Sequence, residues 1–387
     1  MPRFFPTLLA LLLLVTAGCE LEHADDRSPS DTVATRPDTT GLALALAETR
    51  RAQIGPAREP LDLRFPTGND ALFRDKSAFY AALDLDEIPG LREYGWEGGQ
   101  YGYVRNPAKG SRGMIFARPH EGLDIKPLYF DARGEPADTV RAISDGRVVY
   151  ANRGRSNSSY GQYVVVEHTW DGAPVYSLYA HLERVDVSPA DSVAAGAPLG
   201  RLGYTGRGTA RHRAHVHLEV NLLLNAHFQP FFNAFYGSRN THGIYFGRNL
   251  AGLDVEALYR VHGLNPEFSF LEFVRSRPLA YRIAIPGEYP LDLLARYPWL
   301  TEGSAEPDSS GAWVVGFTQE GVPVEVSRQK EAVDAPEVVW VADRIERGRL
   351  GTNGILARGD STYHLTRDGK AAAALLATSE RGVPPWF

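Results

Sequence analysis

The chain has 387 residues, a formal net charge of −6, a pI near 6.0, and 43% hydrophobic and 11% aromatic residues. This length accommodates two or three domains, and the composition excludes a wholly disordered or collagen-like chain because it supplies enough apolar side chains for a sizeable core. The acidic balance, without a block of Lys and Arg, excludes the phosphate-neutralising surface of a nucleic-acid-binding protein, so we expect no nucleic-acid partner.

Residues 1–18 have the pattern of a secretion signal. They read MPRFFPTLLALLLLVTAG, with one Arg near the start, an apolar run from Leu8 to Val15 and small residues at the end. The run is shorter than the roughly 20 residues that cross a bilayer as a helix. Because small residues precede Cys19, the stretch resembles a bacterial lipoprotein signal, which implies cleavage before Cys19 and lipidation of that residue. The alternative is an ordinary secretory signal followed by an incidental cysteine.

A lipid anchor at Cys19 would hold the mature chain at a membrane surface, since each buried methylene contributes about 0.8 kcal/mol. Lipoproteins retained at the inner membrane often carry Asp after the lipidated cysteine, whereas Glu20 follows it here. We therefore expect a lipid-anchored protein of the cell envelope, at the outer membrane and facing the periplasm.

The rest of the chain divides by composition into four parts. Residues 19–60 are rich in Asp, Arg, Thr, Ser and Pro, which predicts a flexible tether. Residues 61–109, in which aromatic residues recur among turn residues, predict a small N-terminal folded segment. Residues 110–225 predict a mainly β domain of antiparallel strands, and residues 226–387 predict a C-terminal accessory domain of mixed, β-rich structure.

The strands expected in the central part are short and separated by Gly, Asp and Pro. RVVYANR (147–153) predicts one strand, and QYVVVEHTW (162–170) and VYSLYAHL (175–182) predict a hairpin across an Asp-Gly-Ala-Pro turn. In the C-terminal part, FQPFFNAFYG and LEFVRS predict helices, whereas residues 313–327 and 362–376 predict hairpins. The sequence has no repeat of fixed period, which disfavours a solenoid or a propeller.

Imidazole and carboxylate side chains in the central part predict a metal site. Cys19 is the only cysteine, so a disulfide framework and a Cys-rich zinc finger are excluded. His120 and Asp124 are four residues apart, but Pro119 and Gly122 disfavour a helix, and we expect a loop that runs into a strand. Such a turn can aim an imidazole nitrogen and a carboxylate oxygen at one point, and both groups are zinc ligands.

A second pair of histidines lies in AHVHLEV (214–220), which alternates as a half-buried strand does. Residues two apart on a strand project from the same face, so His215 and His217 face the same space. If one binds a metal, the other stands where an acid, a base or a transition-state stabiliser is needed. His181 ends the predicted hairpin strand and can bring a further imidazole to the same cleft.

Other residues near this pattern receive structural interpretations. GRLGYTG (200–206) lacks the Gly-Lys-Ser/Thr of a phosphate loop and predicts a tight turn between strands. Glu219 is expected either to hold a ligand imidazole from outside the first coordination sphere or to point outward from the strand. His168 and His212 are expected at the surface.

The stretch of about 110–225 resembles the lysostaphin-type, LytM-like zinc metalloendopeptidases, which cut peptide cross-links in bacterial peptidoglycan. The segments that carry the resemblance are RPHEGLDI, AISDGRVVYA, YGQYVVVEH, YSLYAHLERVDVSPADSVAAGAPLGRLGYTG and HVHLEV. The resemblance implies that His120, Asp124 and His217 bind one zinc ion and that His181 and His215 are the catalytic pair. The sequence departs from the family before His215, where RGTARHRA replaces a short Ser/Thr-Gly-Pro link, while every ligand position is filled.

The resemblance implies a zinc-dependent endopeptidase that attacks peptidoglycan stem peptides with a metal-activated water, since three protein ligands leave one tetrahedral position open. No HExxH motif supports a thermolysin-like arrangement. Two other functions stay open: a catalytically silent LytM-like module that binds peptidoglycan or activates a hydrolase, and a zinc D-alanyl carboxypeptidase. The C-terminal domain is a candidate site for a protein partner.

Overall fold

The computed structural model describes residues 60–81, 98–110, 113–207, 209–303, 306–343, 354–359 and 362–387. The predicted signal, the predicted lipidation site at Cys19 and almost all of the predicted tether lie outside these residues. Among the described helices, none combines the length and apolar character needed to cross a bilayer.

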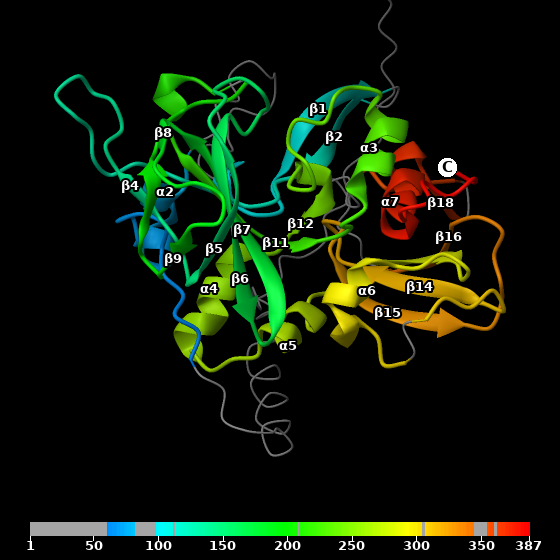
Figure 1. Cartoon of the computed structure of the whole chain (residues 1–387). Coiled ribbons are helices and arrows are strands. Elements are labelled where there is room, and N and C mark those ends of the chain that lie inside the picture. Colours follow the sequence, from blue (N-terminus) through cyan, green and yellow to red (C-terminus); the bar gives the residue numbers. More distant parts are fainter. Residues whose placement is uncertain are drawn as a thin grey trace, which may run out of the picture. The chain divides into compact units, whose positions relative to one another are not determined.

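A large antiparallel sheet forms the centre of the fold (Figure 1). Asp171 and Gly172 join two of its strands with positive φ angles of 50° and 77°, the conformation of a tight two-residue hairpin turn. The predicted hairpin is therefore confirmed, although its second strand begins earlier, at Ala173. The strands follow the order β12 (Leu250–Gly252), β11 (Val216–Leu223), β7 (Ala173–Leu182), β6 (Gln162–Trp170), β5 (Gly146–Asn152) and β9 (Ser192–Val193), and β3 (Leu123–Ile125) pairs with β11.

Smaller sheets accompany the central one. Strands β4 (Thr139–Arg141), β10 (Pro198–Arg201) and β8 (Arg184–Val185) form an antiparallel sheet, and β1 (Val104–Gly110) pairs with β2 (Gly113–Pro119). Farther along the chain, β15 (Pro323–Gln329), β14 (Ala312–Phe317), β13 (Tyr281–Pro286) and β16 (Glu337–Val341) form another sheet, and β17 (Leu356–Arg358) pairs with β18 (Tyr363–Leu365). The mainly antiparallel β fold predicted from the sequence is confirmed.

Strand β11 is covered on both of its faces. Each of its residues is buried, so the half-buried strand expected from the alternating sequence is wrong in this respect. Val216, Leu218, Val220 and Leu222 belong to the hydrophobic core on one side. The intervening positions on the other face carry polar side chains, among them His217 and Glu219. The alternation therefore separates a core face from a buried polar face.

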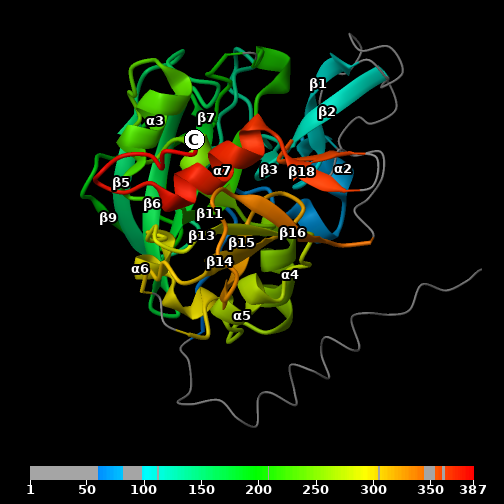
Figure 2. The ribbon, with the colours of Figure 1, turned by 90° about the vertical axis from the view of Figure 1, so that its right-hand side faces the viewer.

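The helices come mainly from the C-terminal half. They are α3 (Phe228–Tyr236), α4 (Val255–Leu264), α5 (Phe270–Arg275), α6 (Leu293–Arg296) and α7 (Arg367–Ala377), together with α2 (Lys76–Phe79) near the start of the described chain. Helices α3 and α5 confirm the two predicted helical segments. Figure 2 shows α7 between α3 and the C-terminal sheet, and α7 contacts both α3 and β13.

The hairpin predicted for residues 362–376 is wrong. The chain forms the short strand β18 and then enters α7. Thr366 caps this helix, because its hydroxyl oxygen accepts a hydrogen bond from the backbone N–H of Gly369 at 3.0 Å. Asp368 and Gly369 therefore lie in the first helical turn, and the following alanines favour the helix.

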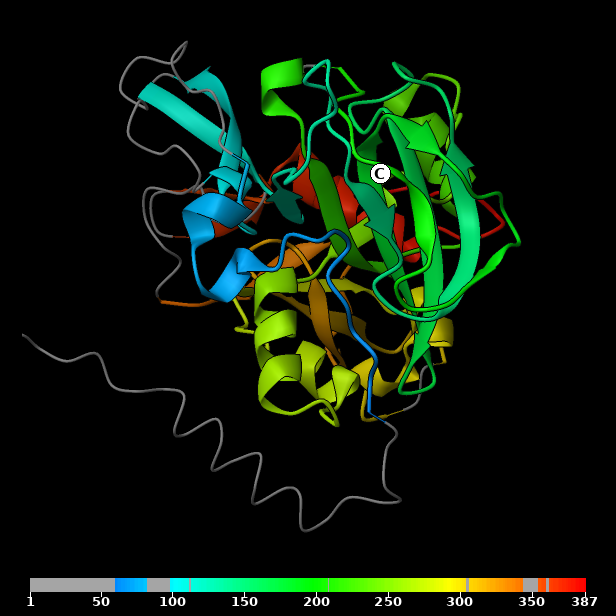
Figure 3. The same cartoon turned by 90° about the vertical axis from the view of Figure 1, so that its left-hand side faces the viewer.

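The segment 60–81 packs against α4 and β3. Phe65 stacks on Tyr259 with ring centroids 4.5 Å apart, and the Tyr259 hydroxyl donates to the carbonyl of Arg64 at 2.6 Å. Figure 3 shows this segment in blue beside α4. The backbone N–H of Ala81 donates to the carbonyl of Asp124 at 2.8 Å. The N-terminal segment therefore supports the short strand that carries one candidate metal ligand.

Candidate metal centre

Pairing between β3 and β11 places two candidate ligands opposite each other. Asp124 faces His217 in the register of this pair, and Ala180 of β7 faces His217 on its other side. His120 lies just before β3, in the loop that runs into a strand, as predicted. Gly122 allows this loop to approach β11, because a Cβ atom there would overlap the carbonyl oxygen of Leu218. Ligands from distant parts of the sequence are thus brought together by backbone pairing.

His120, Asp124 and His217 form a tight cluster. Asp124 Oδ1 lies 2.9 Å from His217 Nδ1 and 3.1 Å from His120 Nε2, and the two nitrogens are 3.0 Å apart. The three side chains are 2–5% exposed. A zinc ion bound about 2.0–2.2 Å from each donor needs donors separated by roughly 3–3.5 Å. This group can therefore hold a metal ion.

The hydrogen bonds of the other ring nitrogens select the tautomers that a metal ion needs. His120 Nδ1–H donates to the carbonyl of Gln100 at 2.8 Å, which leaves Nε2 unprotonated. His217 Nε2–H donates to Glu219 Oε1 at 2.7 Å, which directs Nδ1 toward Asp124. Both rings thus aim a lone pair at the centre of the cluster.

Glu219 is buried and accepts hydrogen bonds from three directions. Besides His217, the Tyr160 hydroxyl donates to Oε1 at 2.7 Å and Asn221 Nδ2 donates to Oε2 at 3.0 Å. Burial works against its charged form, but these donors outweigh burial and lower the pKa of Glu219. Of the two interpretations that the sequence left open, the structure selects the one in which Glu219 holds the His217 ring.

His181 and His215 lie beside the cluster, with ring centroids 4.5 Å apart. Each donates its Nδ1–H to a backbone carbonyl, His181 to Thr205 at 2.8 Å and His215 to Arg213 at 2.6 Å. The unprotonated nitrogen of each ring is therefore Nε2, and that of His215 is 3.5 Å from Asp124 Oδ1. His181 adopts a positive φ of 62° at the end of β7.

The charges of these imidazoles follow from their surroundings. Burial, followed by the neighbouring His215 and His217, lowers the pKa of His181 well below 6.5, so this ring is neutral. Burial also works against a charge on His217, but hydrogen bonds to Asp124 and Glu219 raise its pKa to about 10. A metal ion at His217 Nδ1 must therefore displace a proton, so metal binding weakens as the pH falls.

The structure brings together the side chains of all five residues that the sequence singled out here: His120, Asp124, His181, His215 and His217. His212 is exposed, as expected. His168 is not at the surface but 1% exposed, because Nδ1 donates to the carbonyl of Asp145 and Nε2 contacts the Ser177 hydroxyl, both at 2.7 Å. The surface position predicted for His168 is wrong.

Sequence reasoning missed the groups that orient these rings. The carbonyls of Gln100, Thr205 and Arg213 belong to the backbone and leave no side-chain signal in the sequence. Tyr160 is 59 residues from Glu219, and no local spacing links them. Tyr160 lies in YGQYVVVEH, one of the segments that carry the family resemblance, which was the available signal.

Comparisons with known proteins agree with this geometry. Residues 118–230 match the model of peptidase family M23. Lipoprotein NlpD of Yersinia enterocolitica is 32% identical over 89 residues, which cover 23% of this chain and 79% of that protein. Outer membrane antigenic lipoprotein B of Haemophilus influenzae is 30% identical over 101 residues, 26% of this chain and 21% of its own length. Murein hydrolase activator NlpD of Escherichia coli is 32% identical over 90 residues, 23% of this chain and 21% of its own length.

Among solved structures, the catalytic domain of lysostaphin from Staphylococcus simulans is 32% identical, with 31% of this chain and 76% of that chain covered and a TM-score of 0.23. The alignments with the Haemophilus and Escherichia relatives cover only about a fifth of the length of those two proteins. The alignment with the Yersinia relative covers 79% of that protein. The residues matched to the family model include His120, Asp124 and His217. The chain therefore belongs to peptidase family M23, with the LytM-like and lysostaphin-like peptidases.

Proposed function

We propose that the protein is a zinc-dependent endopeptidase that hydrolyses peptide cross-links of bacterial peptidoglycan. The observation that supports this activity best is the convergence of His120, Asp124 and His217, with His181 and His215 beside them. A module that had lost its activity would have no need to keep both the cluster and the neighbouring pair. Membership of family M23 supports the same reaction class.

The donor set fits one zinc ion per chain. Two imidazole nitrogens and one carboxylate oxygen are common zinc ligands, and three protein ligands are typical of a catalytic site. When bound, a zinc ion supplies a Lewis acid that polarises the scissile carbonyl and lowers the pKa of water. The carboxylate of Asp124 offsets part of the positive charge.

Side chains of the protein itself accept the proton of the attacking water and later release it. His181 and His215 are suited to accept it at Nε2, because their Nδ1–H groups are held by backbone carbonyls. An imidazole that has accepted the proton can stabilise the oxyanion and return the proton to the leaving amine. The lowered pKa of His181 keeps its ring neutral, so Nε2 carries no proton before the reaction.

A second candidate function is activation of another peptidoglycan hydrolase without cleavage. The Escherichia relative is named a murein hydrolase activator, which favours this alternative. Digestion of purified peptidoglycan separates the two functions. An endopeptidase converts cross-linked fragments to monomers on its own, whereas an activator does so only when a second hydrolase is added. Release of free alanine instead would indicate a carboxypeptidase.

The names of the relatives also support a location. Two of them are called lipoproteins, and one of these is called an outer membrane protein. We extend the proposal to a lipid anchor at Cys19 in the outer membrane, with the described part of the chain in the periplasm. The C-terminal residues 226–387 are proposed as an accessory domain that contacts a protein partner.

Replacement of single histidines tests the assignment of roles. We expect His215→Ala to abolish cross-link cleavage while the protein retains about one zinc per chain, because His215 lies outside the ligand cluster. His217→Ala should lose both zinc and activity, because it removes a ligand. The checks are metal analysis of the purified protein and mass identification of the released fragments. Loss of zinc from the His215→Ala variant would mean that the two roles are exchanged, and full activity in either variant would contradict the mechanism.

A further inference from the structure

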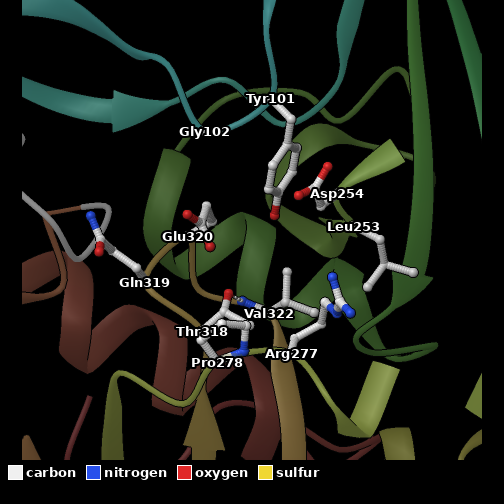
Figure 4. Close-up of a pocket in the computed structure, with 10 residues that line it drawn as sticks. All are labelled: Tyr101, Gly102, Leu253, Asp254, Arg277, Pro278, Thr318, Gln319, Glu320 and Val322. Carbon is white, nitrogen blue, oxygen red and sulfur yellow. Dashed lines mark hydrogen bonds between the residues drawn. The ribbon is translucent and has the colours of Figure 1, made fainter. Parts of the chain in front are cut away.

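A cavity of about 330 Å³ is lined by residues other than the metal ligands. Segments distant in the sequence line it, and they include Tyr101, Asp254, Arg277, Thr318 and Glu320. Figure 4 shows these side chains around a common space, with the guanidinium and the two carboxylates among them. The volume is at the lower end of the range for small-molecule sites. Its lining combines both signs of charge.

Arg277 is the cationic group of this cavity. Its guanidinium lies over the ring of Phe273, 4.2 Å from the centroid, and donates from Nε to the Phe273 carbonyl and from Nη2 to the Ser276 hydroxyl. In the described part of the chain it has no carboxylate oxygen within 4.0 Å, and the charge of Asp254 acts on it from a greater distance. Burial lowers the pKa of Arg277. A guanidinium that is desolvated in this way favours a carboxylate from a ligand.

Asp254 and Glu320 are the anionic groups. Asp254 Oδ1 accepts the backbone N–H of Ala257 at 2.9 Å as the N-cap of α4, and burial raises the pKa of its carboxyl group. The Glu320 carboxylate lies beside Gly102, since a Cβ atom at that glycine would be 3.4 Å from Glu320 Oε1. Carboxylates in a partly desolvated site favour an ammonium group.

We infer that this cavity binds a small zwitterion, with its carboxylate at Arg277 and its ammonium group toward Asp254 and Glu320. The chemistry is that of an α-amino acid head group. This head group has two sources: a free amino acid, or a residue of an uncross-linked peptidoglycan stem peptide that carries both a free amine and a free carboxylate. Only the second source rests on the proposed function.

The cavity shares a wall with the metal centre. Tyr101 and Gly102 follow Gln100, whose carbonyl orients the His120 ring, and Gly102 N–H donates to the His120 carbonyl at 2.9 Å. The Tyr101 hydroxyl donates to the carbonyl of Gly252 in β12 at 2.8 Å. A zwitterion in the cavity would therefore lie against the backbone segment that holds one candidate metal ligand.

Calorimetric titration of the mature full-length chain tests this inference. The probes are alanine, alaninamide, which lacks the carboxylate, and N-acetylalanine, which lacks the ammonium group. We expect alanine to bind at one site per chain, and each blocked compound to bind at least tenfold more weakly. Arg277→Gln should weaken alanine binding at least tenfold, whereas Arg275→Gln, which changes an exposed arginine at the end of α5 that pairs with Glu302, should leave it unchanged.

Two further comparisons complete the test. A stem peptide with a free α-amino acid head group, compared with the same peptide acetylated on that amine, identifies the source: tighter binding of the free peptide than of alanine indicates the stem. The His215→Ala variant should bind the probes normally, which separates this site from the proposed catalysis.

The inference is overturned if neither alanine nor the peptide binds saturably, or if the blocked compounds bind equally well. It also fails if Arg277→Gln binds as the unchanged protein does. Thermal unfolding checks that the variants fold. If Arg277→Gln does not fold, Asp254→Asn replaces it in the test, because asparagine can still cap α4. This variant should bind alanine and alaninamide more weakly. Unchanged affinity for both compounds would contradict the proposed site.

Discussion

The buried histidines of this protein differ in charge because their partners differ. His217 lies between two carboxylates, which raise its pKa to about 10, whereas His181 has a backbone carbonyl and other imidazoles as neighbours and has a lowered pKa. His168 is buried without a carboxylate partner, and burial lowers its pKa to about 4. Burial keeps His168 and His181 neutral, whereas the hydrogen bonds of His217 to two carboxylates outweigh its burial.

Glu219→Gln should weaken zinc binding about 10–100-fold, because it removes the negative charge that receives His217 Nε2–H. Competition with a chromophoric chelator measures the affinity. Tyr160→Phe is the matched control, since it removes one hydrogen bond from the same carboxylate and leaves its charge, and we expect a smaller effect. Equal affinity in Glu219→Gln and the unchanged protein would show that Glu219 does not support the metal site.

His168 should make the protein less stable in mild acid. Its pKa is about 4 in the folded state, below the usual 6.5, so the unfolded chain binds a proton that the folded chain excludes. The resulting stability is complete above pH 6.5 and decreases as the pH falls toward 4, by about 3 kcal/mol in total. Denaturant unfolding across this range should show a shallower pH dependence in His168→Gln. The exposed His212→Gln is the control, and an unchanged slope in His168→Gln would refute the assignment.

The metal centre forms where the short strand β3 and the loop before it lie against β11. Strand β3 is only three residues long, yet it sets the register of Asp124 against His217. The loop before it can approach β11 because residue 122 has no side chain. Strand β12 pairs with the last three residues of β11, Asn221 to Leu223. The next residue after β12 is Leu253, which lines the cavity.

Gly122→Ala should destabilise the fold by about 1–3 kcal/mol and weaken zinc binding, because the new methyl group forces β3 away from β11. Gly263→Ala in α4 is a matched control, since a Cβ atom there meets nothing within 4 Å. It should leave zinc binding unchanged and stabilise the helix by up to about 1 kcal/mol. Denaturant unfolding and chelator competition measure both effects. A Gly122→Ala variant as stable as the unchanged protein would rule out this packing argument.

At the scale of the whole molecule, one core joins the segments on either side of the family domain. The main cluster of buried apolar residues runs from Leu72 and Phe79 through the central sheet to Trp313 and Leu376. The region from Arg58 to the C-terminus accordingly packs as one compact unit. The residues matched to family M23 are therefore held by segments before and after them, although the predicted limits of the separate parts stay predictions.

Cys19→Ser should release the protein from membranes, because it removes the thiol that a lipoprotein signal requires. Fractionation of cells into soluble and membrane parts measures the change. Ser28→Ala, in the predicted tether, should remain with the membrane fraction. Processed Cys19→Ser protein that stays in that fraction would contradict the lipid anchor.

The sequence by itself determined the elements with strong local signals. The Asp-Gly turn, the β pattern of 162–182 and the aromatic segments of α3 and α5 all depend on neighbouring residues, and local geometry is enough to predict them. The hairpin predicted at 362–376 is wrong because Thr366 caps a helix that begins at Arg367 and continues through the alanines. The ligand set came from the family resemblance, since spacing alone left the roles open.

Only the tertiary structure decided how the site is built. Backbone carbonyls select the tautomers of His120, His181 and His215, and a backbone group carries no mark in the sequence. Burial of His168 and of both faces of β11 depends on what packs over them from distant segments. The mixed-charge cavity likewise joins Tyr101, Asp254 and Arg277, which no local pattern connects. Contacts between residues far apart in the chain are set by the complete fold, which is the physical reason that they escape sequence reasoning.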